Sequence, residues 1–216
     1  MSLSQSVLVV AVSGPWVASA LATSMSATPG PNNAMLASSG SLWGFRRTIP
    51  HMLGIAIGFG FMLLGVAGGL GGLLVHHPTA LEVMRCLAVV YLLYLAYRIA
   101  TATPADADAH RPTPRKGRPF TFLQAAAFQW VNPKAWIIVL SGLATLTTAA
   151  NHTSLQLVVL LAATFVIVIC FSAALWTSLG VTAARFLRTP RALRRFNLLM
   201  AALLVASIVM AIVGVG

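Results

Sequence analysis

The sequence is poor in charge, and it is poorest in acidic residues. Only 8% of its 216 residues are charged, and Asp and Glu together number 3 against 14 Lys and Arg. A soluble domain carries roughly 25% charged residues, so a water-exposed globular protein is excluded. Disordered chains have low hydrophobicity, so a mean hydropathy of +0.88 excludes disorder as well. The natural solvent for this chain is lipid.

Other absences exclude most kinds of active site. Cys86 and Cys170 are the only cysteines, which excludes a disulfide scaffold, and their wide separation argues against a thiol relay. The histidines lack ligand spacing and have no acids nearby, so we expect no metal and no cofactor. Because phosphate loops and GxSxG motifs are missing, we expect no enzyme. The basic residues lie between apolar runs, which argues against a nucleic-acid partner.

Long continuous apolar runs are what the sequence does contain. A membrane helix takes about 20 apolar residues, so the chain has room for about six, which we place near 5–27, 49–75, 80–99, 121–148, 154–184 and 196–214. The short alternating segments of an outer-membrane barrel are not found. The expected fold class is therefore an all-α polytopic membrane protein.

The basic residues predict the orientation of these spans. They cluster in three connections, which contain Arg46 and Arg47; Arg98, Arg111, Arg115, Lys116 and Arg118; and Arg185, Arg188, Arg191, Arg194 and Arg195. The other two connections contain almost no basic residues. Since Lys and Arg resist translocation, the basic connections should face the cytoplasm and both termini should be extracytoplasmic.

A proline-rich basic linker at 101–119 divides the chain into residues 1–100 and 120–216. Each part is expected to contain three spans. Because three is odd, two related parts would have opposite orientations in the membrane, as in the inverted repeats of many secondary transporters.

Each part contains a run that cannot be uninterrupted α-helix. The first run holds Pro29, Gly30, Pro31, Asn32 and Asn33, and the second holds Asn132, Pro133 and Lys134. Half-helices that begin at Pro31 and Pro133 would expose free N–H groups and partial positive charge, which suit a carboxylate. At the second break Asn132 can cap the helix that Pro133 begins, and Lys134 adds a full positive charge. We therefore expect a substrate site at the paired breaks. The alternatives are simple proline kinks and, for Lys134, a side chain that reaches the cytoplasmic interface.

Two further features concern the second and third spans. Gly54 and Gly58, Gly65 and Gly69, and Gly68 and Gly72 form three small-xxx-small pairs, which predict either a homodimer interface or packing against the first or fifth span. His51, near the inner end of the second span, is expected to be an interfacial histidine, with proton transfer as the alternative. We expect Tyr91 to face a polar pathway, where it could bind a substrate ammonium.

Several motifs together resemble the LysE/RhtB superfamily of amino-acid exporters. They are TPGPNN at 28–33, GFRR at 44–47, the glycine-rich second span and FQWVNPKAW at 128–136, and they look most like the cysteine and O-acetylserine exporter branch. The resemblance implies efflux of amino acids or close derivatives across the bacterial inner membrane, driven by the proton-motive force. Its motif positions coincide with the residues named at the two breaks.

The residues also predict the substrate class. No Asp or Glu falls in the middle of any span, so a second cationic group on the substrate would meet no carboxylate. We therefore expect small neutral or polar amino acids rather than basic ones. The competing hypotheses are a cation or metal exporter of related architecture and, less favoured, a membrane-embedded redox protein.

Overall fold

The computed structural model describes residues 30–72, 76–101, 118–149, 155–186 and 189–213, and all their regular secondary structure is helical. The expected first span at 5–27, Pro29 and most of the 101–119 linker lie outside the described residues. The helices are α2 (Pro31–Trp43), α3 (Phe45–Gly65), the π-helical segment η1 (Val66–Leu70), α5 (Pro78–Ala100), α6 (Phe122–Val131), α7 (Pro133–Ala149), α8 (Leu155–Phe186) and α9 (Pro190–Val213).

The helix lengths confirm an all-α membrane protein. Within the described ranges, three segments are long and apolar enough to cross a membrane: Phe45–Leu70, Leu155–Phe186 and Arg191–Val209. They correspond to the expected second, fifth and sixth spans. The third span is α5, and the fourth is broken into the short helices α6 and α7. The division into inverted repeats at 1–100 and 120–216 stays a prediction, because the first span lies outside the described residues.

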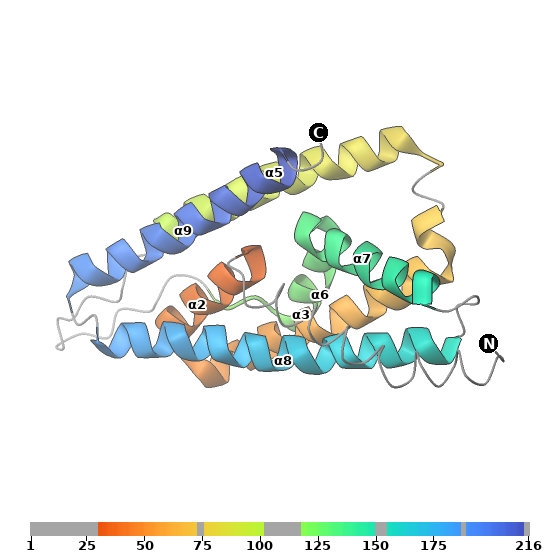
Figure 1. Cartoon of the computed structure of the whole chain (residues 1–216). Coiled ribbons are helices and arrows are strands. Elements are labelled where there is room, and N and C mark those ends of the chain that lie inside the picture. The colour runs from red at the N-terminus through yellow and green to blue at the C-terminus, as the bar shows by residue number, and fades with distance from the viewer. Residues whose placement is uncertain (1–29, 73–75, 102–117, 150–154, 187–188, 214–216) are drawn as a thin grey trace.

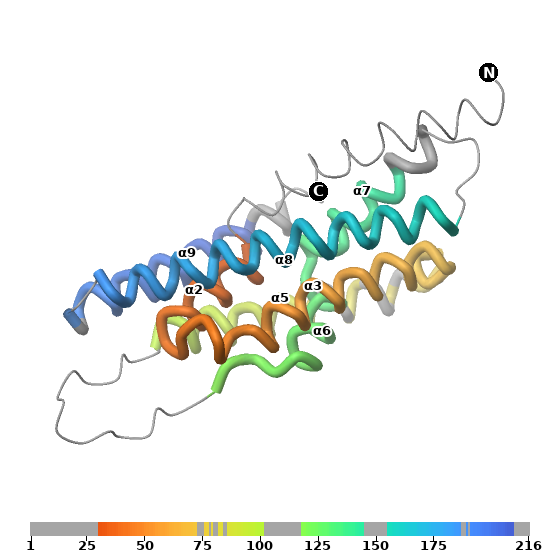
Figure 2. Tube along the Cα trace, turned by 90° about the horizontal axis from the view of Figure 1, so that it is seen from below, coloured from red at the N-terminus to blue at the C-terminus, as the bar shows by residue number. Residues whose placement is uncertain are grey.

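The helices form two layers with α2 between them (Figure 1). One layer holds α5 and α9, which run side by side and pack on each other. The other holds α8 and α3, and α6 lies against α3 (Figure 2). Because α2 contacts both α8 and α9, its polar residues are enclosed rather than turned to lipid.

Gly44 allows the chain to turn directly from α2 into α3. It has a φ of 80° and a ψ of 170°, a backbone conformation that residues with a Cβ rarely adopt. Its N–H donates to the carbonyl oxygen of Gly40 at 3.0 Å, which closes the end of α2. A glycine within the GFRR motif is thus a requirement of this tight turn.

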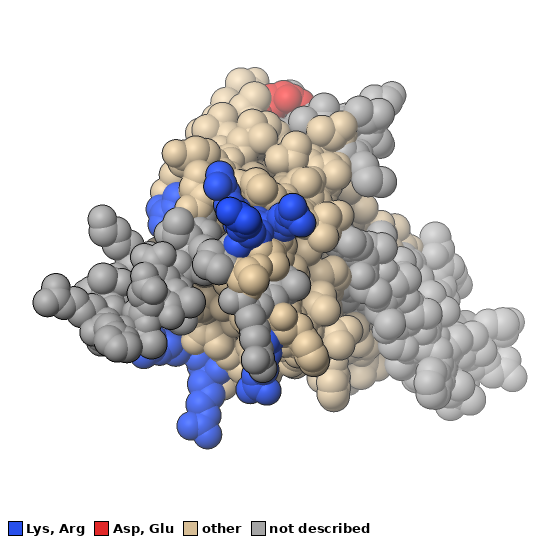
Figure 3. Space-filling model, turned by 90° about the vertical axis from the view of Figure 1, so that its left-hand side faces the viewer, with Lys and Arg blue, Asp and Glu red and all other residues tan. Residues whose placement is uncertain are grey.

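The described arginines, Arg85 apart, gather at one end of the molecule. Arg46 and Arg47 open α3, Arg98 ends α5, Arg185 ends α8, and Arg191, Arg194 and Arg195 open α9. Figure 3 views this end and shows the blue basic residues around it. All of these side chains are exposed. The fold therefore brings the basic connections together, as the topology prediction requires.

The glycines of α3 have a different partner from the one expected. A Cβ on Gly54 would overlap the Phe122 carbonyl oxygen, and one on Gly58 would lie 2.5 Å from the Ala126 Cα, so this pair packs on α6. The sequence had suggested the first or fifth span. The difference arises because the break before Pro133 frees α6 to lie in the groove that the missing side chains leave. Gly68 and Gly72 meet only open space.

Glycines also allow α2 to pack closely against α8. A Cβ on Gly40 would overlap the Thr177 carbonyl oxygen, and a Cβ on Gly180 would overlap the Ala37 carbonyl oxygen. Such backbone contact is possible only where neither helix presents a side chain. It sets the position of α2, and hence of the residues at its start.

Candidate functional site

The first break occurs where the motif predicts it. Gly30 has an extended backbone, with φ −167° and ψ 179°, and α2 begins at Pro31. The Gly30 carbonyl oxygen accepts the Ala34 N–H at 2.9 Å, which is the first bond of the helix. Pro31 suits this position because the first helical residue needs no N–H donor. No side chain caps this helix start.

The second break confirms the expected roles of Asn132 and Pro133. Asn132 leaves the helical region, with φ −87° and ψ 108°, and α7 begins at Pro133. The Oδ1 atom of Asn132 accepts the Lys134 N–H at 3.1 Å, and its carbonyl oxygen accepts those of Ala135 and Trp136 at 3.0 and 3.3 Å. The first turn of α7 is therefore already capped. The expectation of free N–H groups is wrong for this helix, because Asn132 uses them.

Two tryptophans stabilise the elbow between α6 and α7. The indole Nε1–H of Trp136 donates to the Trp130 carbonyl oxygen at 2.8 Å, and the two rings meet edge to face with centroids 6.1 Å apart. A carbonyl group that loses its helical partner in lipid must be satisfied within the protein. Trp136 supplies that partner and helps to hold the angle between the half-helices.

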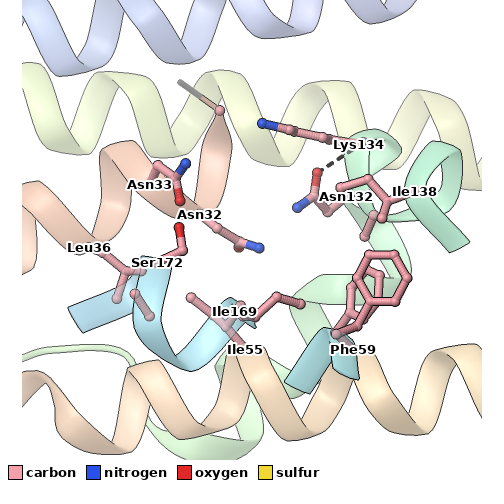
Figure 4. A pocket seen from close by; sticks show the side chains of 14 residues that line it. Asn32, Asn33, Leu36, Ile55, Phe59, Asn132, Lys134, Ile138, Ile169 and Ser172 are labelled. Carbon is pink, nitrogen blue, oxygen red and sulfur yellow. Dashed lines mark hydrogen bonds between the residues drawn. The ribbon is translucent and has the colours of Figure 1, made fainter. Parts of the chain in front are cut away.

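The two helix starts open on one pocket with a cavity volume of about 50 Å³ (Figure 4). Its polar side chains come from three elements and are Asn32, Asn33, Asn132, Lys134 and Ser172. Its larger apolar side chains are Leu36, Ile55, Phe59, Ile138, Phe165 and Ile169. The fold thus joins the two breaks, which are about a hundred residues apart in sequence, in a single polar site with an apolar floor.

Lys134 is the cation of this pocket. Its side chain runs across the pocket toward the start of α2 (Figure 4). A Cβ on Gly30 would lie 2.9 Å from the Lys134 Cδ and 3.0 Å from its Nζ, so the ammonium lies directly beside Gly30. Within the described residues, α2, α3 and α6 to α9 carry no Asp or Glu, and none of the residues that line this pocket is acidic.

Gln129 is a site residue that the sequence reasoning missed. Its side chain is completely buried, and its amide pairs with that of Asn32. Asn32 Nδ2 donates to Gln129 Oε1 at 2.9 Å, and Gln129 Nε2 donates to Asn32 Oδ1 at 3.4 Å and to the Ala125 carbonyl oxygen at 2.8 Å. This pair links the first break to α6. The signals for Gln129 in the sequence were its place in the FQWVNPKAW motif and a glutamine within an apolar run, whereas Ser172 gave no signal.

The remaining described candidates, Pro31, Pro133 and Tyr91, do not line the pocket. Pro31 and Pro133 shape the backbone, and Pro29 lies outside the described residues. The ring of Tyr91 lies 5.8 Å from that of Phe128 and 6.4 Å from that of Tyr94, measured between centroids. It belongs to the packing between α5 and α6, and Tyr91 is not among the residues that line this pocket.

The described residues form an all-helical membrane fold in which the helix starts at Pro31 and Pro133 open on one polar pocket, an arrangement found in many secondary transporters. Comparison with known proteins names the family. A family model described as LysE type translocator matches residues 23–213, so the chain belongs to the LysE family. Among its described residues, no group of His, Cys, Asp or Glu could hold a metal ion.

Curated relatives match over a shorter stretch. The "Cysteine/O-acetylserine efflux protein" of Salmonella choleraesuis (strain SC-B67) is 36% identical over 121 residues, which cover 56% of this chain and 57% of the relative. The proteins with the same name in Salmonella typhimurium and Escherichia coli (strain K12) are 36% and 34% identical over the same shares. The match thus spans little more than half the length of these relatives. No solved structure matches the chain.

Proposed function

We propose that this protein exports amino acids or close derivatives across the bacterial inner membrane, with a preference for small neutral or polar side chains. The observation that carries the proposal is the placement of Lys134 and Asn132 beside the start of α2, in a pocket lined by no acidic residue. The relatives' printed name, cysteine/O-acetylserine efflux, agrees with substrates of this size and charge.

The pocket suits the two ends of a zwitterion differently. The Lys134 ammonium and the positive end of α2 attract the carboxylate, and the Asn132 amide turns toward the same space (Figure 4). Backbone carbonyl oxygens freed at the breaks, or the Ser172 hydroxyl, accept hydrogen bonds from the substrate ammonium. The apolar floor of Leu36 and Ile169 accommodates a short side chain. A lysine or arginine side chain would leave its second cation without a partner.

The remaining parts of the proposal follow from the family and the charge pattern. Export is driven by the proton-motive force and proceeds by alternating access, with the two parts of the chain moving about the breaks. The arginine-rich end faces the cytoplasm, which puts both termini outside. Gly68 and Gly72, which meet open space, are candidates for a homodimer contact.

Release of dipeptide-derived amino acids tests the function. Cells that express the protein are loaded with alanyl, seryl or lysyl dipeptides, and free amino acids outside are measured with and without a protonophore. We expect release of neutral amino acids that the protonophore abolishes. Release of lysine without any neutral amino acid would contradict the proposed substrate class.

Lys134→Gln tests the site. A hydrogen bond to a charged group contributes about 1.5–3 kcal/mol, so its loss should weaken apparent substrate affinity roughly 10- to 150-fold. Arg194→Gln is the matched control, because it removes one exposed cation at the arginine-rich end and should leave affinity unchanged. Unchanged affinity in Lys134→Gln would remove this residue from the site.

A further inference from the structure

A set of buried polar side chains lies between the pocket and the arginine-rich end, outside the site described above. They come from four helices and are Ser38, Ser41, Thr48, His51, Thr177 and Asn197. Polar groups enclosed in a membrane protein are costly unless they are satisfied, and they commonly mark functional paths. This set is therefore the strongest feature that the pocket leaves unexplained.

The helices place these residues at one depth. Thr177 lies one turn beyond the pocket residue Ala173 in the direction of Arg185, and His51 lies one turn before the pocket residue Ile55. Asn197 lies one turn before Met200, which packs in one cluster with Ala34 and Ala37 of α2. Together they line the contact between α2 and its neighbours α3, α8 and α9 on the arginine side of the pocket.

Part of this set is satisfied and part is not. The Thr48 hydroxyl lies 2.9 Å from that of the neighbouring buried Ser39, and Ser41 donates to the Ser38 carbonyl oxygen at 2.8 Å. By contrast, both ring nitrogens of His51 and the hydroxyl oxygen of Thr177 find no hydrogen-bond partner in the described part of the chain. His51 is only 1% exposed and Thr177 is completely buried, so neither reaches water in this conformation.

A buried polar group that makes no hydrogen bond carries a desolvation penalty, so these atoms favour a conformation in which water reaches them. The contact that covers Thr177 itself is made by backbone. A Cβ on Gly40 would overlap the Thr177 carbonyl oxygen, and a Cβ on Gly180 would overlap the Ala37 carbonyl oxygen. Nearer the pocket, Leu36 of α2 packs in one cluster with Ala173 of α8, so separation of the two helices would expose Thr177 and also unpack Leu36.

We propose that the buried polar residues between α2, α3 and α8, which we call the polar seam, form the path by which the substrate reaches the pocket from the cytoplasm. This path is closed in this structure. The proposal rests on the proposed export function. Hydroxyl and imidazole groups can bind a small zwitterion in passing, and the seam has no carboxylate to retain its ammonium. The path joins the arginine-rich end to Asn33, Ser172 and Lys134.

Thiol modification in inside-out membrane vesicles tests the path. In a full-length Cys86→Ala, Cys170→Ala background, Thr177→Cys is exposed to a charged, membrane-impermeant methanethiosulfonate. Leu179→Cys, on the same helix but 47% exposed at the lipid-facing surface, is the depth-matched control. Thr101→Cys, at an exposed position after α5, gives the rate of a fully accessible thiol.

If the open conformation is populated at about 0.1–10%, Thr177→Cys should react roughly 10- to 1,000-fold more slowly than Thr101→Cys, and faster than Leu179→Cys. The adduct should then block accumulation of serine in the inside-out vesicles, where export appears as uptake, whereas the adduct at Thr101→Cys should not. If Thr177→Cys reacts no faster than Leu179→Cys, the proposed path is wrong. It is also wrong if a fully modified Thr177→Cys variant still exports. The Cys86→Ala, Cys170→Ala protein without a further cysteine tests the proposed function separately. If it exports no amino acid, the proposed function is refuted, whatever the rates of thiol modification in the other variants.

Discussion

The close contact between Gly30 and Lys134 makes Gly30→Ala a sharp test of the site. The extended backbone of Gly30 is open to any residue, and a residue before proline favours this region. The helix start therefore does not need glycine. What needs glycine is the Lys134 side chain, because an added Cβ would lie 2.9 Å from its Cδ and 3.0 Å from its Nζ.

The size of the effect follows from these distances. Ordinary van der Waals contact begins at 3.4 Å, so the Lys134 Cδ must retreat by about 0.5 Å and its ammonium by about 0.4 Å. Lys134 can do this cheaply because it is a flexible chain, and the fold should tolerate the change. A displaced charge loses part of the 1.5–3 kcal/mol of a charged hydrogen bond, and we expect substrate affinity to fall about tenfold.

Concentration-dependent efflux and thermal unfolding in detergent separate these two effects. Gly30→Ala should raise the half-saturating concentration while the unfolding midpoint stays within a few degrees. Gly72→Ala, where the new methyl group meets open space, is the control and should change neither. In the Lys134→Gln background the Gly30→Ala change should have little further effect, since coupled residues are not additive. Wild-type affinity in Gly30→Ala, or equal losses in both backgrounds, would refute the reasoning.

Two further predictions concern the packing of the halves. Gly180→Ala forces α2 away from α8 and should destabilise the protein by about 1–3 kcal/mol or more. The control Gly68→Ala, whose new methyl group meets open space, should not. Equal unfolding midpoints of the two variants would contradict the α2–α8 contact. Gln129→Leu leaves both amide atoms of Asn32 without their partner and should cost about 1–3 kcal/mol, much of which the double change Asn32→Leu, Gln129→Leu should restore. An unfolding midpoint no higher in the double variant than in Gln129→Leu would show that the amide pair does not carry this energy.

Hydropathy and proline placement predicted the fold class and both breaks, because each depends on local properties. Apolar length selects lipid-spanning helices, and a missing N–H at Pro133 interrupts a helix whatever surrounds it. The motifs also named Asn132 and Lys134 before any geometry was known. Asn132 was expected to be able to cap α7, and it does. What the sequence could not predict is that the cap uses the N–H groups that were expected to be free, because this depends on the Asn132 side-chain rotamer.

Contacts between distant segments could not be predicted in this way. The partner of the Gly54 pair, the Asn32–Gln129 amide pair and the position of Tyr91 on Phe128 all depend on how the helices pack. A glutamine gives the same signal in a sequence whether its side chain faces lipid, a neighbouring helix or a pocket. Its environment is known only when the neighbouring helix is in place.

The sparse charges and long apolar runs were therefore sufficient to establish a membrane-embedded helical chain, the grouping of its arginines and the two helix breaks. Those properties arise from transfer free energies and backbone chemistry that act on each segment separately. The pocket exists only because α2, α7 and α8 meet, and the buried seam of His51 and Thr177 exists only because α2 closes against α8. Such features depend on non-local packing, which brings Lys134 to Gly30 across about a hundred intervening residues.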